Sequence, residues 1–200
     1  MEVAMDKRSA ILDAAQAVIR DKGIMGATVD DIAQRAGVAK GTVYLYFKSK
    51  EDVFVEMVVQ KSAETLEAVR SAVAEKPGTW EKLQTAMRIH FASILKHMPN
   101  VMVDEGLLRL TAAQRKKLFQ AKFAHVKFYE GIIADHFAAA RSEPPFSPLA
   151  GALALTAGIL GYVLQRELFS DYMPDPEEYM QTYETIVHAA LAGGEENHEG

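Results

Sequence analysis

Residues 28–47, T-V-D-D-I-A-Q-R-A-G-V-A-K-G-T-V-Y-L-Y-F, constrain the fold more than any other stretch of this chain. Thr28 can cap a first short helix, and Asp31 stands three residues later, where a capping box places its second partner. Gly37 favours the left-handed conformation that ends such a helix. The chain then restarts as a helix through about Phe47. Two short helices joined by a glycine turn predict a helix-turn-helix, whose second helix enters the major groove of DNA.

The second helix carries side chains suited to that contact. Lys40 and Thr42 lie in its first turn, and Lys48 and Lys50 follow its end. Cations neutralise phosphates, while hydroxyl and phenol groups donate to phosphate oxygens or base edges. The alternative is a helical hairpin in which the aromatic residues belong to the core and the lysines face solvent.

The segment 37–54, G-V-A-K-G-T-V-Y-L-Y-F-K-S-K-E-D-V-F, closely resembles the DNA-binding segment of TetR-type (tetracycline-repressor-like) transcriptional regulators. The resemblance runs from Ala10 to about Met57 and includes the motifs I-L-D-A-A and T-V-D-D-I-A-Q-R-A-G-V. Beyond about residue 60 only the length and the helix pattern match. The resemblance implies an all-α homodimer of about nine helices. Each chain would have an N-terminal three-helix helix-turn-helix DNA-binding domain and a C-terminal helical ligand-binding and dimerisation domain.

The family's DNA contacts can be carried over by matching positions. The residues that the resemblance implies as DNA-binding are Thr28, Lys40, Gly41, Thr42, Tyr44, Leu45, Tyr46, Lys48 and Lys50. The position before Lys40 departs from the pattern, because Ala39 stands where the family often has a hydroxyl residue. The second helix therefore lacks a side-chain cap, which contributes about 1 kcal/mol.

We expect a DNA-binding domain over residues 1–50, a ligand-binding and dimerisation domain over 51–192, and a disordered tail over 193–200. The net charge of −5 is unevenly spread: residues 1–50 hold eight Lys and Arg against six Asp and Glu, which leaves −7 on the rest. A mildly basic end on an acidic chain confines DNA contact to that end.

Several classes of function are disfavoured by the sequence. There are no cysteines, which rules out disulfides, zinc fingers and thiol catalysis. Phosphate-binding loops, nucleophile elbows and closely spaced histidine ligands are absent, so we expect no enzyme, no metal and no cofactor. No apolar run follows the first charges, so we expect no signal peptide and a cytoplasmic protein.

Apolar periodicity and capping residues predict the remaining helices. The expected helices cover residues 7–22, 49–73, 80–98, 101–110, 111–140, 147–164 and 175–192. Gly23 ends the first of these, with Ile24 and Met25 packing beneath the helix-turn-helix. Thr111 with Gln114 forms a capping box, and Ser147 precedes Pro148 at a first helical position, where proline is favoured.

The middle helices carry large, adaptable apolar side chains suited to a small-molecule pocket. The predicted ligand-binding residues are Met87, His90, Phe91, Ile94, Met102, Phe123, Tyr129 and Ile133, with Arg88, His125 and His136 as further polar candidates. The alternative is that these side chains are ordinary core.

Residues 149–164 form an apolar stretch that is about 24 Å long as a helix, shorter than the roughly 30 Å of a bilayer core. We therefore expect a buried helix and no membrane partner. The predicted dimer-interface residues are Gly151, Ala154, Gly158, Gly161, Tyr162, Tyr183 and Val187, in an intersubunit four-helix bundle that the resemblance also implies. The alternative is a core within one chain.

Taken together, these features predict a ligand-responsive repressor that binds a palindromic DNA operator as a dimer and is released by a small apolar or aromatic ligand. The competing interpretation is a helical carrier of a lipid or apolar molecule, which has no need of the lysines and tyrosines around Gly41.

Overall fold

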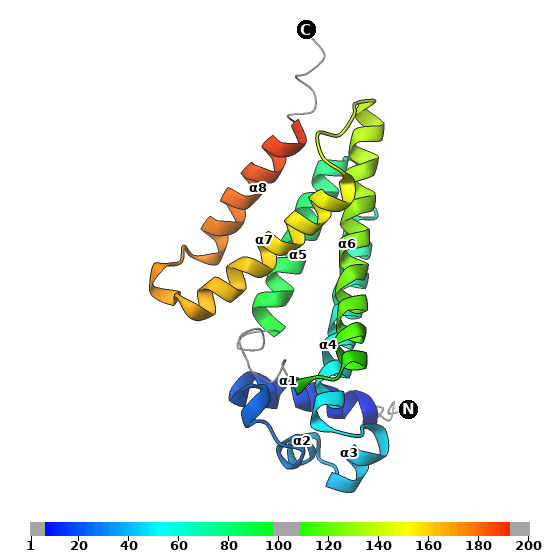
Figure 1. Cartoon of the computed structure of the whole chain (residues 1–200), viewed down its shortest axis with the longest axis vertical. Helices are drawn as coiled ribbons and strands as arrows, with labels where there is room; N and C mark the ends of the chain where they lie inside the picture. Colours follow the sequence, from blue (N-terminus) through cyan, green and yellow to red (C-terminus); the bar gives the residue numbers. More distant parts are fainter. Residues whose placement is uncertain (1–6, 98–108, 193–200) are drawn as a thin grey trace. The chain divides into compact units, whose positions relative to one another are not determined.

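The computed structural model describes residues 7–97 and 109–192 of the chain. These residues form eight α-helices and one short 3-10 helix, and they contain no strand (Figure 1). The helices are α1 (Lys7–Gly26), α2 (Val29–Ala36), α3 (Lys40–Tyr46), α4 (Lys50–Val73), α5 (Thr79–His97), α6 (Ala112–Ala140), α7 (Pro148–Leu168), η2 (Ser170–Tyr172) and α8 (Pro176–Ala192). The predicted all-α fold is confirmed. The helix expected over 101–110 and the tail expected over 193–200 lie outside the described residues, apart from the last two residues of that helix.

Helix starts follow from the capping residues. Thr111 Oγ1 accepts from the Gln114 backbone N–H at 3.2 Å, and the Gln114 side chain accepts from the Thr111 N–H at 2.8 Å. Ser147 Oγ accepts from the N–H of Ala150 before Pro148 opens α7. Asp175 accepts from two backbone N–H groups at the start of α8. Each cap satisfies donors that a helix start would otherwise leave unpaired.

The first helix differs from its prediction. Helix α1 extends to Gly26 through a kink at Gly23, whose φ of 71° and ψ of 171° leave the helical region. Glycine has no Cβ to oppose this conformation, so the chain bends there and resumes for one more turn. Ile24 is buried as expected, whereas Met25 is exposed, so Met25 does not pack beneath the helix-turn-helix.

The chain divides into two compact units, Met1–Glu64 with Lys96–Ala121 and Thr65–Leu95 with Lys122–Gly200. Helices α4 and α6 each contribute residues to both units. The predicted domain boundary at residue 50 stays a prediction.

The core of the first unit joins α1 to α4. Its buried residues include Leu12 and Ile19 from α1, Ile32 from α2, Val43 from α3 and Phe54 from α4. Val43 is the only buried residue within α3, and Phe47 directly after it is buried as well. These two anchors leave the rest of α3 at the surface.

The core of the second unit is built by helices α4 to α8. Its largest fully buried side chains include Tyr129, Tyr162 and Met87. Helix α7 contributes Ala152, Leu155, Ile159, Tyr162 and Val163 from one face. The second unit therefore buries one side of its most apolar helix.

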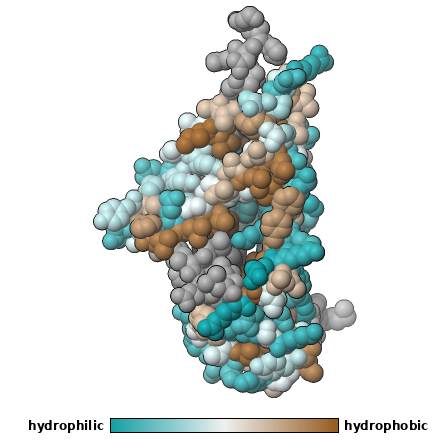
Figure 2. Space-filling view, viewed as in Figure 1, coloured by the Kyte–Doolittle hydropathy of each residue, from teal (hydrophilic) through white to brown (hydrophobic). Residues whose placement is uncertain are grey.

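The other side of α7 is apolar and exposed. Among the described residues, α7 is the one helix long and apolar enough to cross a membrane by length and composition, over Pro148–Arg166. Only 28% of that stretch is buried within one chain, so the chain itself supplies only part of the expected burial. Figure 2 shows hydrophobic residues gathered along the surface where Figure 1 places α7. Leu149, Leu153 and Leu168 are among the exposed residues of this face.

Candidate functional site

The helix-turn-helix is closed by its predicted caps. Thr28 Oγ1 accepts from the Asp31 N–H at 3.1 Å, and Asp31 Oδ2 accepts from the Thr28 N–H at 3.1 Å, which completes the capping box. Gly37 lies in the left-handed region with φ 67° and ψ 30°. The N–H of Val38 then donates to Ala33 O at 3.0 Å. The turn between α2 and α3 therefore has the predicted geometry.

Helix α3 presents its polar and aromatic residues to solvent. Tyr44 and Tyr46 are about half exposed, and Leu45 is 83% exposed. A Cβ built on Gly41 would meet no atom within 4 Å, so this position is open on its outer side. Ala39 makes no side-chain cap, as expected. Anchored by Val43 and Phe47, α3 offers one chemically varied face to a partner.

Two lysines of the first unit, Lys40 and Lys22, are held by aspartates of α2. Lys40 Nζ lies 2.8 Å from Asp30 Oδ2, and both side chains are at least half exposed. Asp30 raises the pKa of Lys40 through this hydrogen bond. Lys22 Nζ lies 2.7 Å from Asp31 Oδ1, and that hydrogen bond lowers the pKa of Asp31. The sequence spacing did not indicate that Asp30 pairs with Lys40.

The ammonium group of Lys50 contacts backbone oxygens of its own chain, whereas the predicted phosphate contact needs it free at the surface. Its Nζ donates to the backbone oxygens of Ile24 at 2.7 Å and Met25 at 3.3 Å. The structure therefore gives Lys50 a role in holding the last turn of α1 against the start of α4. Lys48 remains exposed beside it.

Polar contacts fix the remaining sides of the first unit. Glu56 on α4 accepts from Arg8 at 2.8 Å and also pairs with Lys117 of α6. Gln114 Nε2 donates to Asp52 Oδ1 at 2.7 Å. These contacts join α1 and the first turns of α6 to α4, so polar pairs as well as the core hold the helices that pack beside the helix-turn-helix.

The predicted ligand residues lie together in the second unit. Met87, Phe91, Tyr129 and Ile133 are buried in its core, with Ile94 and Phe123 packed against them. Met102 lies outside the described residues. Fully buried side chains contact protein in this conformation, so for them the core interpretation also holds.

The polar candidates separate into three groups. Arg88 is engaged by Glu177 and Glu184 of α8, and His136 Nδ1 lies 2.9 Å from Thr79 Oγ1. His90 and His125 instead stack on one another, with ring centroids 4.5 Å apart. Among the described residues, no group of three or more potential ligands could hold a metal ion.

The structure corrects part of the predicted dimer interface. Tyr162 is 1% exposed and donates to Pro174 O at 2.7 Å, so it belongs to the core of one chain. A Cβ on Gly158 would lie 2.4 Å from the Tyr183 hydroxyl of the same chain. That glycine is small because α8 approaches α7 closely, which is the intramolecular alternative. Gly151 likewise faces Phe146, whereas Ala154 and Gly161 keep accessible surface.

The remaining predicted interface residues lie on α8. Tyr183 donates to the backbone oxygens of Ala154 and Leu155, and Val187 packs partly against the core. Ile186 was not foreseen and is 60% exposed.

Comparisons with known proteins point to one family. Residues 11–57 match the family model described as "Bacterial regulatory proteins, tetR family". The chain is 31% identical over 136 residues to the "Fatty acid metabolism regulator protein" of Bacillus subtilis, which covers 68% of this chain and 70% of that protein.

Solved structures show the same fold. The fatty acid degradation regulator FadR of Bacillus halodurans has a TM-score of 0.79 at 24% identity, covering 96% of this chain and 98% of that one. FadR from Bacillus subtilis in complex with stearoyl-CoA has a TM-score of 0.75 at 24% identity, covering 91% and 98%. The matched segment contains the helix-turn-helix described above. The chain belongs to the tetR family of bacterial regulatory proteins and is a DNA-binding transcriptional regulator.

Proposed function

We propose that this regulator is a cytoplasmic repressor that binds a palindromic operator as a homodimer and is released by a small apolar ligand carrying an acyl chain. The observation that carries the DNA half is the exposed face of α3. Thr42, Tyr44 and Leu45 would read base edges and thymine methyl groups, which present distinct patterns in the major groove. Thr28, Gly41, Tyr46 and Lys48 would position the phosphate backbone, with Lys40 exchanging Asp30 for phosphate.

The homodimer is supported by the exposed apolar residues of α7 and α8. A stable interface needs a contiguous apolar centre, and Leu153 and Ile186 supply large side chains for it. Two-fold symmetry would place two α3 helices in successive major grooves, about 34 Å apart. Repression requires that this operator overlap a promoter, where the bound dimer would block the polymerase.

The ligand half is supported by the apolar second unit and by the relatives. One relative is named for fatty acid metabolism, and one neighbour was solved with stearoyl-CoA. Helix α4 runs continuously through residues of both units. A ligand that favours one conformation of the second unit can therefore change the conformation of the first unit through α4. A tenfold loss of DNA affinity needs a coupling free energy of about 1.4 kcal/mol.

The experiment is selection of bound sequences from random duplex DNA at two salt concentrations, using the wild-type chain and Leu45→Ala. A palindrome should be recovered whose affinity falls steeply with salt. The sequences selected with Leu45→Ala should show a different or weaker base preference at the position that Leu45 contacts. The wild-type selection is then repeated with stearoyl-CoA, which should lower the yield. A folded dimer that enriches no sequence would contradict the operator and favour the apolar-ligand carrier.

A further inference from the structure

Polar side chains meet inside the second unit at one level of α5 and α6. His90 of α5 and His125 of α6 stack with ring centroids 4.5 Å apart and planes 19° from parallel. The Tyr129 hydroxyl lies 3.4 Å from His90 Nδ1. The hydrophobic core of the same unit includes Met87 and Phe91 of α5 and Tyr129 of α6. A polar group at this depth requires a partner or a function.

His90 is neutral at physiological pH. Burial, followed by the charges of His125 and Lys122, lowers the pKa of His90 to about 3. Burial also raises the pKa of Tyr129, so its phenol keeps its proton. We assign the phenol as donor to His90 Nδ1, which puts the single imidazole proton on Nε2. Nε2–H is then a hydrogen-bond donor.

His90 is not completely enclosed by the protein. Its side chain keeps an intermediate accessible surface, although protein surrounds it closely enough to depress its pKa. Burial also lowers the pKa of the neighbouring Lys122 ammonium group, although the residue keeps accessible surface. Within the described residues, no hydrogen bond reaches His90 Nε2.

We propose that His90 Nε2–H donates a hydrogen bond to the acyl oxygen, carbonyl or carboxylate, of a long-chain ligand whose hydrocarbon part lies along Ile94 and Phe123. This inference rests on the ligand half of the proposed function. An acceptor is favoured over a donor because His125, Lys122 and Tyr129 make the surroundings of His90 rich in N–H and O–H groups and electrostatically positive. The half-buried Ile94 and Phe123 offer apolar surface next to the core.

The test compares three ligands of one chain length on the full-length protein: methyl dodecanoate, dodecanoic acid and 1-chlorododecane, which has no acyl oxygen. Binding is followed by the fluorescence of Trp80, the single tryptophan, which packs against the core of the second unit. His90→Phe keeps a ring to stack on His125 and removes the donor. His188→Phe is the matched control, because His188 also contacts an aromatic ring, meeting Trp80 edge to face with ring centroids 4.5 Å apart.

We expect His90→Phe to weaken the tighter-binding acyl ligand about tenfold, as the loss of one buried hydrogen bond would, and to change chlorododecane less than twofold. His188→Phe should leave the ratio of acyl ligand to chlorododecane unchanged. A preference of the wild type for the acid identifies a carboxylate, and a preference for the ester identifies a carbonyl.

Two results would overturn the inference. Equal weakening of all three ligands by His90→Phe would mean that the ring only packs. Failure of the wild type to bind any of the three would remove the ligand half of the proposed function as well, while DNA selection would still report on the operator.

Discussion

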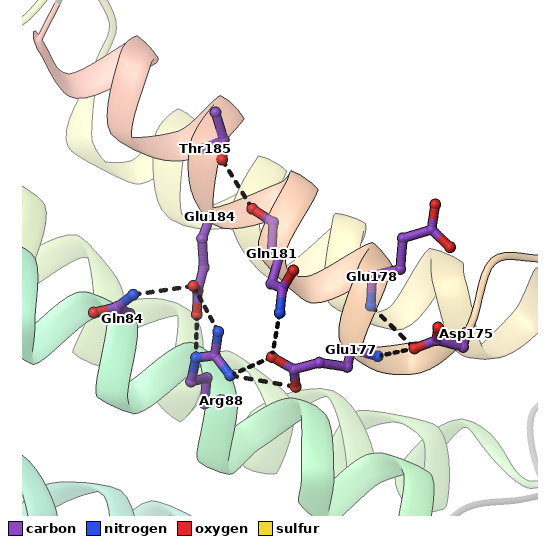
Figure 3. A network of polar contacts seen from close by, with 8 residues as sticks. All are labelled: Gln84, Arg88, Asp175, Glu177, Glu178, Gln181, Glu184 and Thr185. Carbon is purple, nitrogen blue, oxygen red and sulfur yellow. Dashed lines mark hydrogen bonds and ion pairs between the residues drawn. The ribbon is translucent and has the colours of Figure 1, made fainter.

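Arg88 of α5 and Glu184 of α8 form a two-point ion pair that joins the two helices inside the second unit (Figure 3). Arg88 Nη2 donates to Glu184 Oε2 at 2.9 Å, and Nε lies 2.6 Å from Oε1 as a charge contact without hydrogen-bond alignment. Glu184 is only 6% exposed and also accepts from Gln84 at 3.0 Å. Arg88 extends the network to Glu177, whose pKa it lowers. On either side of Arg88, Met87 is buried in the core and Ile89 packs against it. The ion pair therefore joins a core-forming part of α5 to α8.

Replacing Glu184 by alanine should destabilise the protein by about 2 kcal/mol, because two hydrogen bonds to the carboxylate are lost and Arg88 is left partly desolvated. Urea denaturation followed by circular dichroism measures this change. Glu178→Ala is the control on the same helix, since the Glu178 side chain points away from Arg88 in Figure 3. Its effect should stay within about 0.5 kcal/mol. Equal losses in both variants would show that the ion pair contributes nothing specific.

Asp30→Asn should strengthen DNA binding. In the free protein Asp30 holds Lys40 at 2.8 Å, and a lysine released from this pair is available to a phosphate. Both side chains are exposed, so the gain comes from one added cation at the DNA surface. The slope of log affinity against log salt should steepen by about one unit.

The control for this change is Asp13→Asn, which removes one carboxylate from Lys61 on α4, while Glu64 still holds that lysine at 3.0 Å. Fluorescence anisotropy with the selected operator and with random duplex DNA measures both variants. The gain for Asp30→Asn should appear on both DNAs, because phosphate contacts carry no sequence information. An unchanged salt slope would mean that Lys40 does not reach the backbone.

Acid should destabilise the second unit through His90. The folded pKa of about 3 lies below the ordinary value of 6.5, so the unfolded chain binds the proton first as the pH falls. Stability from the neutral imidazole is therefore complete above pH 6.5 and is lost between 6.5 and 3, by at most about 1.4 kcal/mol for each pH unit. When the midpoint of urea denaturation is plotted against pH, His90→Phe should reduce the slope of the curve between pH 3 and 6.5. His188→Phe should leave that slope unchanged. Parallel curves for the two variants would assign the acid sensitivity elsewhere.

Local signals predicted the fold well. Thr28, Gly37, Ser147 and Pro148 act on neighbours within four residues, so their roles can be inferred from sequence spacing alone. The same holds for the exposed face of α3, which follows from two apolar anchors four residues apart, Val43 and Phe47.

Long-range partners were not predictable in the same way. Lys50 takes oxygens 25 and 26 residues earlier in the chain, and Arg88 takes a carboxylate 96 residues later. A lysine after a recognition helix has the same sequence context whether it meets phosphate or a carbonyl. Gly158 shows the same limit, because small size permits close approach by a partner chain or by Tyr183 of its own chain. Sequence spacing carries no information on which of these neighbours is present.

The dimer hypothesis is best tested at large exposed apolar residues, because Gly158→Leu would collide with Tyr183 inside the chain. We predict that Leu153→Glu on α7 and Ile186→Glu on α8 each produce monomers in sedimentation velocity, with helix content unchanged. A two-fold interface contains every substitution twice. Each carboxylate that is buried there without a partner raises the free energy of the dimer by several kcal/mol. Every 1.4 kcal/mol weakens association about tenfold. Ala68→Glu, at an exposed position of α4, adds the same charge on a different helix and should remain dimeric. If both glutamate variants of α7 and α8 also stay dimeric, the chains associate through another surface, and the spacing of the two α3 helices must be set by different contacts.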